Sequence, residues 1–158
     1  MLKWKDMEET MKKFLLACIA LFAAALLFGQ AKSTGLTDSD VQAFCKNFKK
    51  IESDFANYGM DLSDAQALAY ALDADDAVTR ILNKNGISSA NAEDKLRAIA
   101  YAYVLARFDE EMAADPEAAK VLKSMGQDPM AEVRANVSDA DQKVVARRLQ
   151  ELKKVFDN

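Results

Sequence analysis

The sequence contains no histidine, which removes a large part of familiar enzyme chemistry. Histidine is the commonest general base and a usual zinc ligand, and the Ser/His and Cys/His catalytic sets depend on it. An enzyme that uses carboxylates alone needs two acids placed across a cleft, and the spacing of the acids identifies no such pair. We therefore predict that the protein is not an enzyme and that it has no catalytic residues, metal or cofactor.

Glycine and proline are also scarce, with 5 and 2 residues in a chain of 158. A domain built of β-strands needs many turns, and turns draw on these two residue types. Alanine, leucine, lysine and the acids are common instead, and they favour helices. The chain is long enough for one domain with a substantial apolar core, so we predict a single all-α domain.

Clustered positive charge is a third absence. The net charge is -4, and no run of basic residues is longer than two. Proteins that bind nucleic acids usually carry a basic patch, so we expect no nucleic acid among the partners.

The N-terminal region has the pattern of a secretory leader. Lys12 and Lys13 precede an unbroken apolar run over residues 14–28, and Gly29 and Ala31 then supply the small residues of a cleavage site. The apolar run is short for a membrane span, which takes about 20 residues. We predict cleavage after Ala31, with the membrane contacted only through this segment before cleavage.

This leader sets the expected domain boundaries. Residues 1–31 form the signal peptide, residues 32–36 a short linker, and residues 37–158 a single helical domain. Acidic residues before Met11 are unusual at the start of a leader, so Met11 is an alternative start of translation. We expect the mature protein in the periplasm or at the cell surface of a bacterium.

Only one of the two cysteines, Cys45, survives removal of the leader, so an internal disulfide is excluded in the mature chain. We expect Cys45 to be a small, half-buried apolar residue at the edge of a helix. The alternative is a free thiol that reacts or joins a second chain in an oxidising compartment.

The clearest helical signal covers residues 37–58. Thr37 is placed as the N-cap, acidic residues occupy the first turn, and Gly59 is placed to stop the helix. Apolar residues recur at spacings of three and four along one stripe. They are Val41, Phe44, Phe48, Ile51, Phe55 and Tyr58.

Three further long helices are expected over residues 63–86, from about residue 89 or 91 to 113, and over 138–156. Acids at positions 73, 75 and 76 leave open whether the first of these is one helix or two. The pairs Asp115-Pro116 and Asp128-Pro129 each place a cap before a proline, which predicts one or two short helices. The expected fold is a small bundle of four main helices plus these short ones.

Tyr103 and Arg107 mark the most informative position for a site. Arg107 falls near the middle of the apolar face that Leu96, Ile99, Ala100, Tyr103 and Val104 predict for its helix. It can extend to solvent near the helix end or pair with Glu111 one turn on. The alternative is a buried cation in an apolar groove, where it would meet a carboxylate of a ligand or partner.

Two functions follow from these residues. The first is an interaction module of the bacterial envelope that binds another envelope protein through a helix groove. The second is a binder of a small apolar or amphipathic ligand between helices, beside Tyr103 and Arg107.

Overall fold

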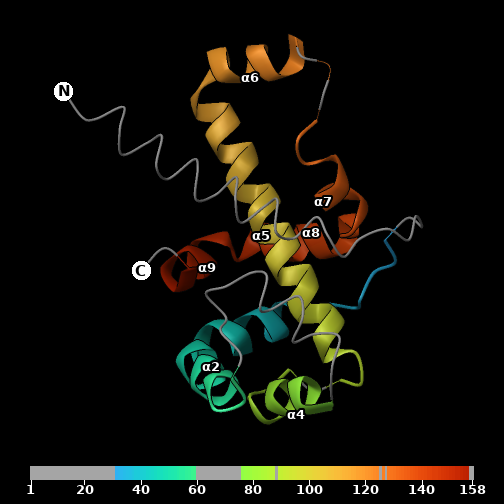
Figure 1. The fold of residues 1–158 in the computed structure, drawn as a ribbon, viewed down its shortest axis with the longest axis vertical. Coiled ribbons are helices and arrows are strands. Elements are labelled where there is room, and N and C mark those ends of the chain that lie inside the picture. The colour runs from blue at the N-terminus through green and yellow to red at the C-terminus, as the bar shows by residue number, and fades with distance from the viewer. Residues whose placement is uncertain (1–30, 60–75, 88, 125, 127, 157–158) are drawn as a thin grey trace, which may run out of the picture.

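The computed structural model describes residues 31–59, 76–87, 89–124, 126 and 128–156 (Figure 1). These residues form seven helices and no strand, which confirms the all-α prediction. The helices are α2 (Asp38–Ala56), α4 (Asp76–Lys84), α5 (Ala92–Ala114), α6 (Pro116–Ser124), α7 (Ala131–Ala135), α8 (Asp139–Arg147) and α9 (Leu149–Phe156). The predicted leader up to Gln30 and the first part of the helix expected over 63–86 lie outside the described residues.

Helix α5 is the centre of the molecule. It packs against α4, α6, α7, α8 and α9, while α2 packs against α4, α8 and α9 (Figure 1). The predicted apolar face of α5 is incomplete for this reason, because a central helix is covered on more than one side. Ala100 and Val104 are only partly buried, whereas these residues outside the predicted face are buried: Ala92, Lys95, Ala98, Tyr101, Ala102 and Leu105.

Helix α2 begins where its capping residues predict. The backbone N–H of Asp40 donates to the Thr37 hydroxyl, and the Asp40 carboxylate accepts from the backbone N–H of Thr37 at 2.9 Å. The helix ends at Ala56, two residues earlier than predicted, and Gly59 follows in the left-handed region with φ of 74°. Tyr58 therefore leaves the predicted stripe and is 61% exposed.

The end of α4 forms a Schellman motif, as the Gly86-Ile87 pair predicts. Gly86 has a φ of 96°, and the backbone N–H of Ile87 donates to the carbonyl of Leu82 at 3.0 Å. The Ile87 side chain is fully buried. A Cβ at Gly86 would lie 3.1 Å from the Cβ of Ala43, so this glycine also permits close packing of α4 on α2.

Only the first of the two Asp-Pro pairs begins a helix at its proline. The Asp115 carboxylate accepts from the backbone N–H groups of Glu117 and Ala118, so it caps α6 with Pro116 in the first helical position. Asp128 accepts from the backbone N–H of Met130, and α7 begins only at Ala131. The prediction that Pro129 opens a helix was therefore wrong, because Pro129 lies in the preceding turn.

The last predicted helix is divided into α8 and α9 at Arg148. No glycine or proline marks this break in the sequence. Arg147 and Arg148 both pair with Asp38 at the start of α2, at 2.7 and 3.2 Å. Both α8 and α9 contact α5 and α2, with α8 packed mainly along α5. The position of the break therefore depends on tertiary contacts, which local periodicity does not predict.

Two buried aspartates connect distant segments of the fold. Asp40 pairs with Lys95 of α5 at 2.9 Å, and both side chains are about nine-tenths buried. Asp141, which is 1% exposed, accepts from the Ser33 hydroxyl and the Thr34 backbone N–H, while Asn91 donates to the Thr34 carbonyl. The segment expected as a linker is thus hydrogen-bonded to α8 and to the residue before α5. Within the described part of the chain, no helix is long and apolar enough to cross a membrane.

Candidate functional site

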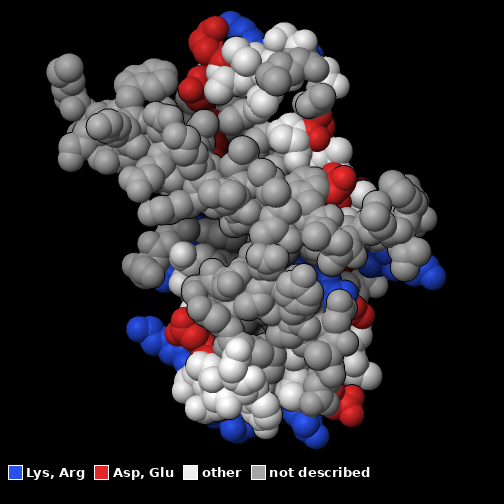
Figure 2. All heavy atoms as spheres, in the orientation of Figure 1, with Lys and Arg blue, Asp and Glu red and all other residues white. Residues whose placement is uncertain are grey.

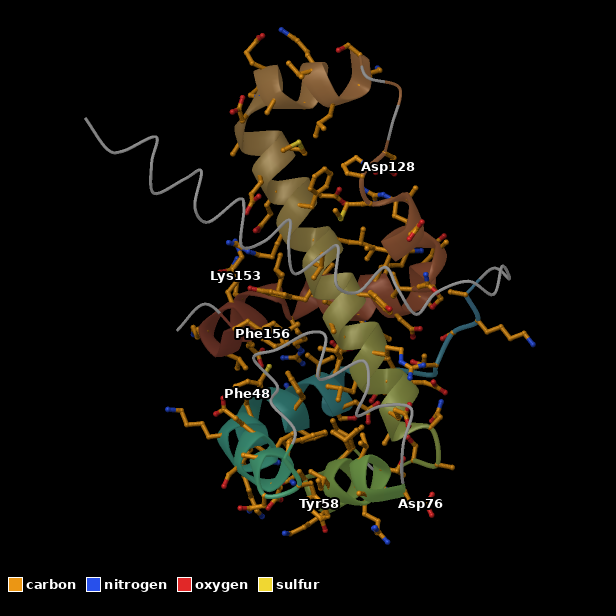
Figure 3. All side chains as sticks on the ribbon, viewed as in Figure 1. Phe48, Tyr58, Asp76, Asp128, Lys153 and Phe156 are labelled. Atoms are coloured by element: carbon orange, nitrogen blue, oxygen red, sulfur yellow. The ribbon has the colours of Figure 1, made fainter. Side chains whose placement is uncertain are left out.

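Four aromatic rings from three helices meet on one side of the molecule. Phe44 and Phe48 come from α2, Tyr103 from α5 and Phe156 from the end of α9; we call these residues the aromatic cluster. The Phe156 ring centroid lies 4.7 Å from that of Tyr103 and 5.7 Å from each of the other two. Figure 3 shows Phe156 next to Phe48, between α9 and α2. Phe44 is buried, whereas Phe156 is 38% exposed.

Charged side chains form one border of the aromatic cluster. Glu110 accepts from Lys153 of α9, with a shortest N–O distance of 2.6 Å, and from Arg107 at 3.4 Å. The hydrogen bond from Lys153 is the main cause that lowers the pKa of Glu110; burial opposes it, and the positive charges of Lys153 and Arg107 add to it. The carboxylate therefore stays charged at neutral pH and presents an acceptor for cations.

The structure brings the two predicted groove residues to this cluster, but it fills the space beside them. Tyr103 is buried beneath Phe156, so α9 occupies the position that a ligand was predicted to take. Arg107 is 28% exposed and pairs with Glu110 rather than with Glu111. A fully buried cation in an open groove is thus not observed at Arg107.

Cys45 lies on α2 between the two phenylalanines of the cluster and is half-buried. Burial, followed by the negative charge of Glu151, raises the pKa of its thiol to about 11, with Arg148 acting in the opposite direction. A thiol with this pKa is almost entirely protonated at neutral pH. The environment therefore favours the apolar role of Cys45 over nucleophilic chemistry.

Alkylation of Cys45 by iodoacetamide at pH 8 should be roughly a hundredfold slower in the folded chain than in urea, because a free thiol has a pKa of about 8.5 and the thiolate is the reactive form. Mass spectrometry of the tryptic peptide that carries Cys45 measures the rate separately from Cys18. Equal rates in the two conditions would show that the thiol is not shielded in the folded protein.

The sequence places Phe44 and Phe48 on one helix stripe and Phe156 at the end of the last predicted helix, but no local pattern joins them to Tyr103. The available signal was that Phe156 is apolar. Other residues of the same predicted helix are apolar too, so this signal did not single it out. In the described part of the chain, no three Cys, Asp or Glu side chains are grouped as a metal site requires.

Comparisons of the chain with protein-family models, with curated proteins and with solved structures find no significant match. The candidate site is therefore defined by its own residues and their geometry.

Proposed function

We propose that the chain is exported by its N-terminal leader and that the mature helical domain binds another protein of the bacterial envelope through the aromatic cluster. The observation that carries this proposal is the 38% exposure of Phe156 within a group of four rings. Single exposed apolar residues such as Tyr58 are ordinary on protein surfaces. A group of rings bordered by charged side chains has instead the composition of an interface centre with a polar rim.

The anchoring of the first described residues supports the export part of the proposal. The hydrogen bonds from Ser33 and Thr34 to Asp141 begin two residues after the predicted cleavage point, and Leu36 is buried in the core. Cleavage after Ala31 would therefore leave every one of these contacts with the mature domain.

A protein partner fits the site better than the alternative, a small apolar ligand beside Tyr103. A small apolar ligand at the position of the Phe156 ring would contact Tyr103 but would offer no charged group to Glu110 at the border. We likewise propose a binding role rather than an enzymatic one, because Glu110 and Glu151, two acids of the described residues in this region, are paired with Lys153 and Arg148. Charges of both signs are interspersed among the described atoms on the face drawn in Figure 2, and this distribution does not favour nucleic acid.

Capture from envelope extracts tests the proposal. A tagged chain, expressed with its own leader and purified from the envelope fraction, is expected to begin at Lys32 by intact mass and to retain one stoichiometric protein. Phe48→Ala should weaken this capture about thirtyfold, because truncation of an aromatic hot-spot residue costs about 2 kcal/mol.

Tyr58→Ala provides the matched control, since Tyr58 is an exposed aromatic residue of the same region of the chain that lies away from the cluster (Figure 3). It should leave capture unchanged. Loss of capture in both variants, or a chain that retains no protein, would contradict the proposed function.

A further inference from the structure

The Phe156 ring packs against its own domain, although 38% of the residue remains exposed. Its ring contacts those of Phe44, Phe48 and Tyr103, all within 5.7 Å between centroids. Those three residues, which we call the three-ring site, therefore accept an aromatic side chain already. Lys153, three residues before Phe156, pairs at the same time with Glu110 at the border.

Helix α9 is the least firmly held of the three helices that form the cluster. Only Leu152 is buried in α9, whereas five residues are buried in α2 and nine in α5. In the last turn, Val155 packs partly buried against the core, Phe156 is 38% exposed, and the side chains of the Lys153–Glu110 pair are 22% and 40% exposed. Ion pairs with this exposure contribute little to stability. The last turn of α9 is thus the part that can leave the cluster most easily.

When this turn leaves, the three-ring site and Glu110 remain available to another aromatic side chain and another cation. After the turn departs, the Glu110 carboxylate still pairs with Arg107 at 3.4 Å. Phe44, which is 1% exposed, would instead lose the ring that helps to cover it. Exposure of apolar rings to water is unfavourable, so the turn stays in place until another aromatic side chain takes its position.

We propose that the last turn of α9 is a displaceable plug of the three-ring site, and that the partner is a protein helix carrying an aromatic residue one turn after a lysine. The aromatic side chain of the partner replaces Phe156, and its lysine replaces Lys153 on Glu110. Side chains three positions apart lie on the same face of a helix, so one helix presents both groups together. This inference rests on the proposed function and names the chemistry of the partner.

The acidic residue at the border favours a helix of this kind over a small neutral ligand. A neutral apolar molecule could fill the position of the Phe156 ring, but it would leave Glu110 without the contact that Lys153 makes. A partner with both groups restores each interaction that the plug provides.

A peptide with the sequence of residues 149–158, labelled with fluorescein, is the probe. We compare its binding to the wild-type chain, to Phe156→Ala and to a chain that stops after Leu152. Both altered chains should bind the probe about tenfold more tightly or better, because the wild-type site is occupied by its own side chain and only the open fraction binds. Circular dichroism checks helix content, and Phe156→Ala replaces a partly exposed ring, so the comparison does not depend on the truncated chain.

Two controls make the probe specific for the site. A peptide in which the phenylalanine is replaced by alanine should bind none of the chains, and Tyr58→Ala should bind the normal peptide as the wild type does. Equal binding of the peptide to the wild type and to Phe156→Ala would overturn the plug. Equal binding of the peptides with phenylalanine and with alanine would overturn it too.

Capture of the envelope partner by Phe156→Ala separates this inference from the proposed function. Stronger capture than by the wild type supports the plug. Weaker capture would show that Phe156 itself forms part of the binding surface, which retains the proposed function and overturns the plug. No partner in any form, together with tighter peptide binding by Phe156→Ala, would overturn the proposed function but not the plug.

Discussion

Replacement of Asp141 by alanine is expected to lower the free energy of unfolding by about 3–5 kcal/mol, because the carboxylate accepts three hydrogen bonds and each bond to a charged group contributes about 1.5 kcal/mol or more. The donors are the hydroxyls of Ser33 and Ser138 and the backbone N–H of Thr34. Asp141 is 1% exposed, so water cannot replace the lost acceptor without local opening.

Urea unfolding followed by circular dichroism measures this effect. Asp139→Ala is the matched control, because Asp139 lies two residues earlier in the first turn of α8 and is exposed. It should change the unfolding free energy only slightly through its interaction with the helix dipole. A similar loss in both variants would mean that negative charge in the first turn of α8, rather than the buried hydrogen bonds of Asp141, explains the result.

Replacement of Lys95 by methionine is the second substitution with a large expected effect. Methionine keeps much of the side-chain volume but removes the ammonium group that lies 2.9 Å from Asp40. Loss of one partner from a buried ion pair costs about 3–5 kcal/mol, and we expect the lower end because Thr37 still donates two hydrogen bonds to Asp40. Chemical unfolding at neutral pH measures the change.

Arg97→Met serves as the control for Lys95→Met. Arg97 belongs to the same helix, and its ion pairs with Glu93 and Asp94 are on the surface, so the expected change is below about 0.5 kcal/mol. An equally small change for Lys95→Met would show that the buried pair contributes no net stability.

The Asp40–Lys95 pair also makes stability depend on pH. Burial on its own would raise the pKa of Asp40, but hydrogen bonds from Thr37 and Lys95 and the charge of Lys95 together hold this pKa below its usual value of 3.8. A carboxyl group whose pKa is lower in the folded state stabilises the fold above its unfolded pKa, and this contribution is lost as the pH falls through the folded value. In Lys95→Met, the part of this acid dependence that comes from Lys95 should therefore diminish.

The candidate site was predictable only in part. Tyr103 and Arg107 were identified because both fall on the apolar face that the spacing predicts for the helix ending near residue 113. The contact of the Phe156 ring with Tyr103 could not be predicted, because the two residues are 53 positions apart (156 minus 103). They belong to helices whose packing no local pattern specifies. The pairing of Glu110 with both Arg107 and Lys153 of α9 was likewise not predictable, because Lys153 comes from a distant segment of the chain.

The starts of α2, α6 and α8 and the end of α4 were determined by the sequence itself. Thr37, Asp115 and Ser138 cap the helices that follow them, and Gly86 ends α4, because a cap or a left-handed glycine acts on backbone groups only a few residues away. Such interactions need no information from the rest of the fold.

The tertiary structure alone decided which charges are buried, where the last helix breaks and what covers Tyr103. Lys95 reaches Asp40 across 55 positions, and Asp141 holds Thr34 across 107. Arg148 interrupts the final helix although its local sequence permits continuation, and both Arg147 and Arg148 there pair with Asp38 of α2. These outcomes depend on contacts between segments far apart in the chain, which local periodicity and capping residues cannot encode.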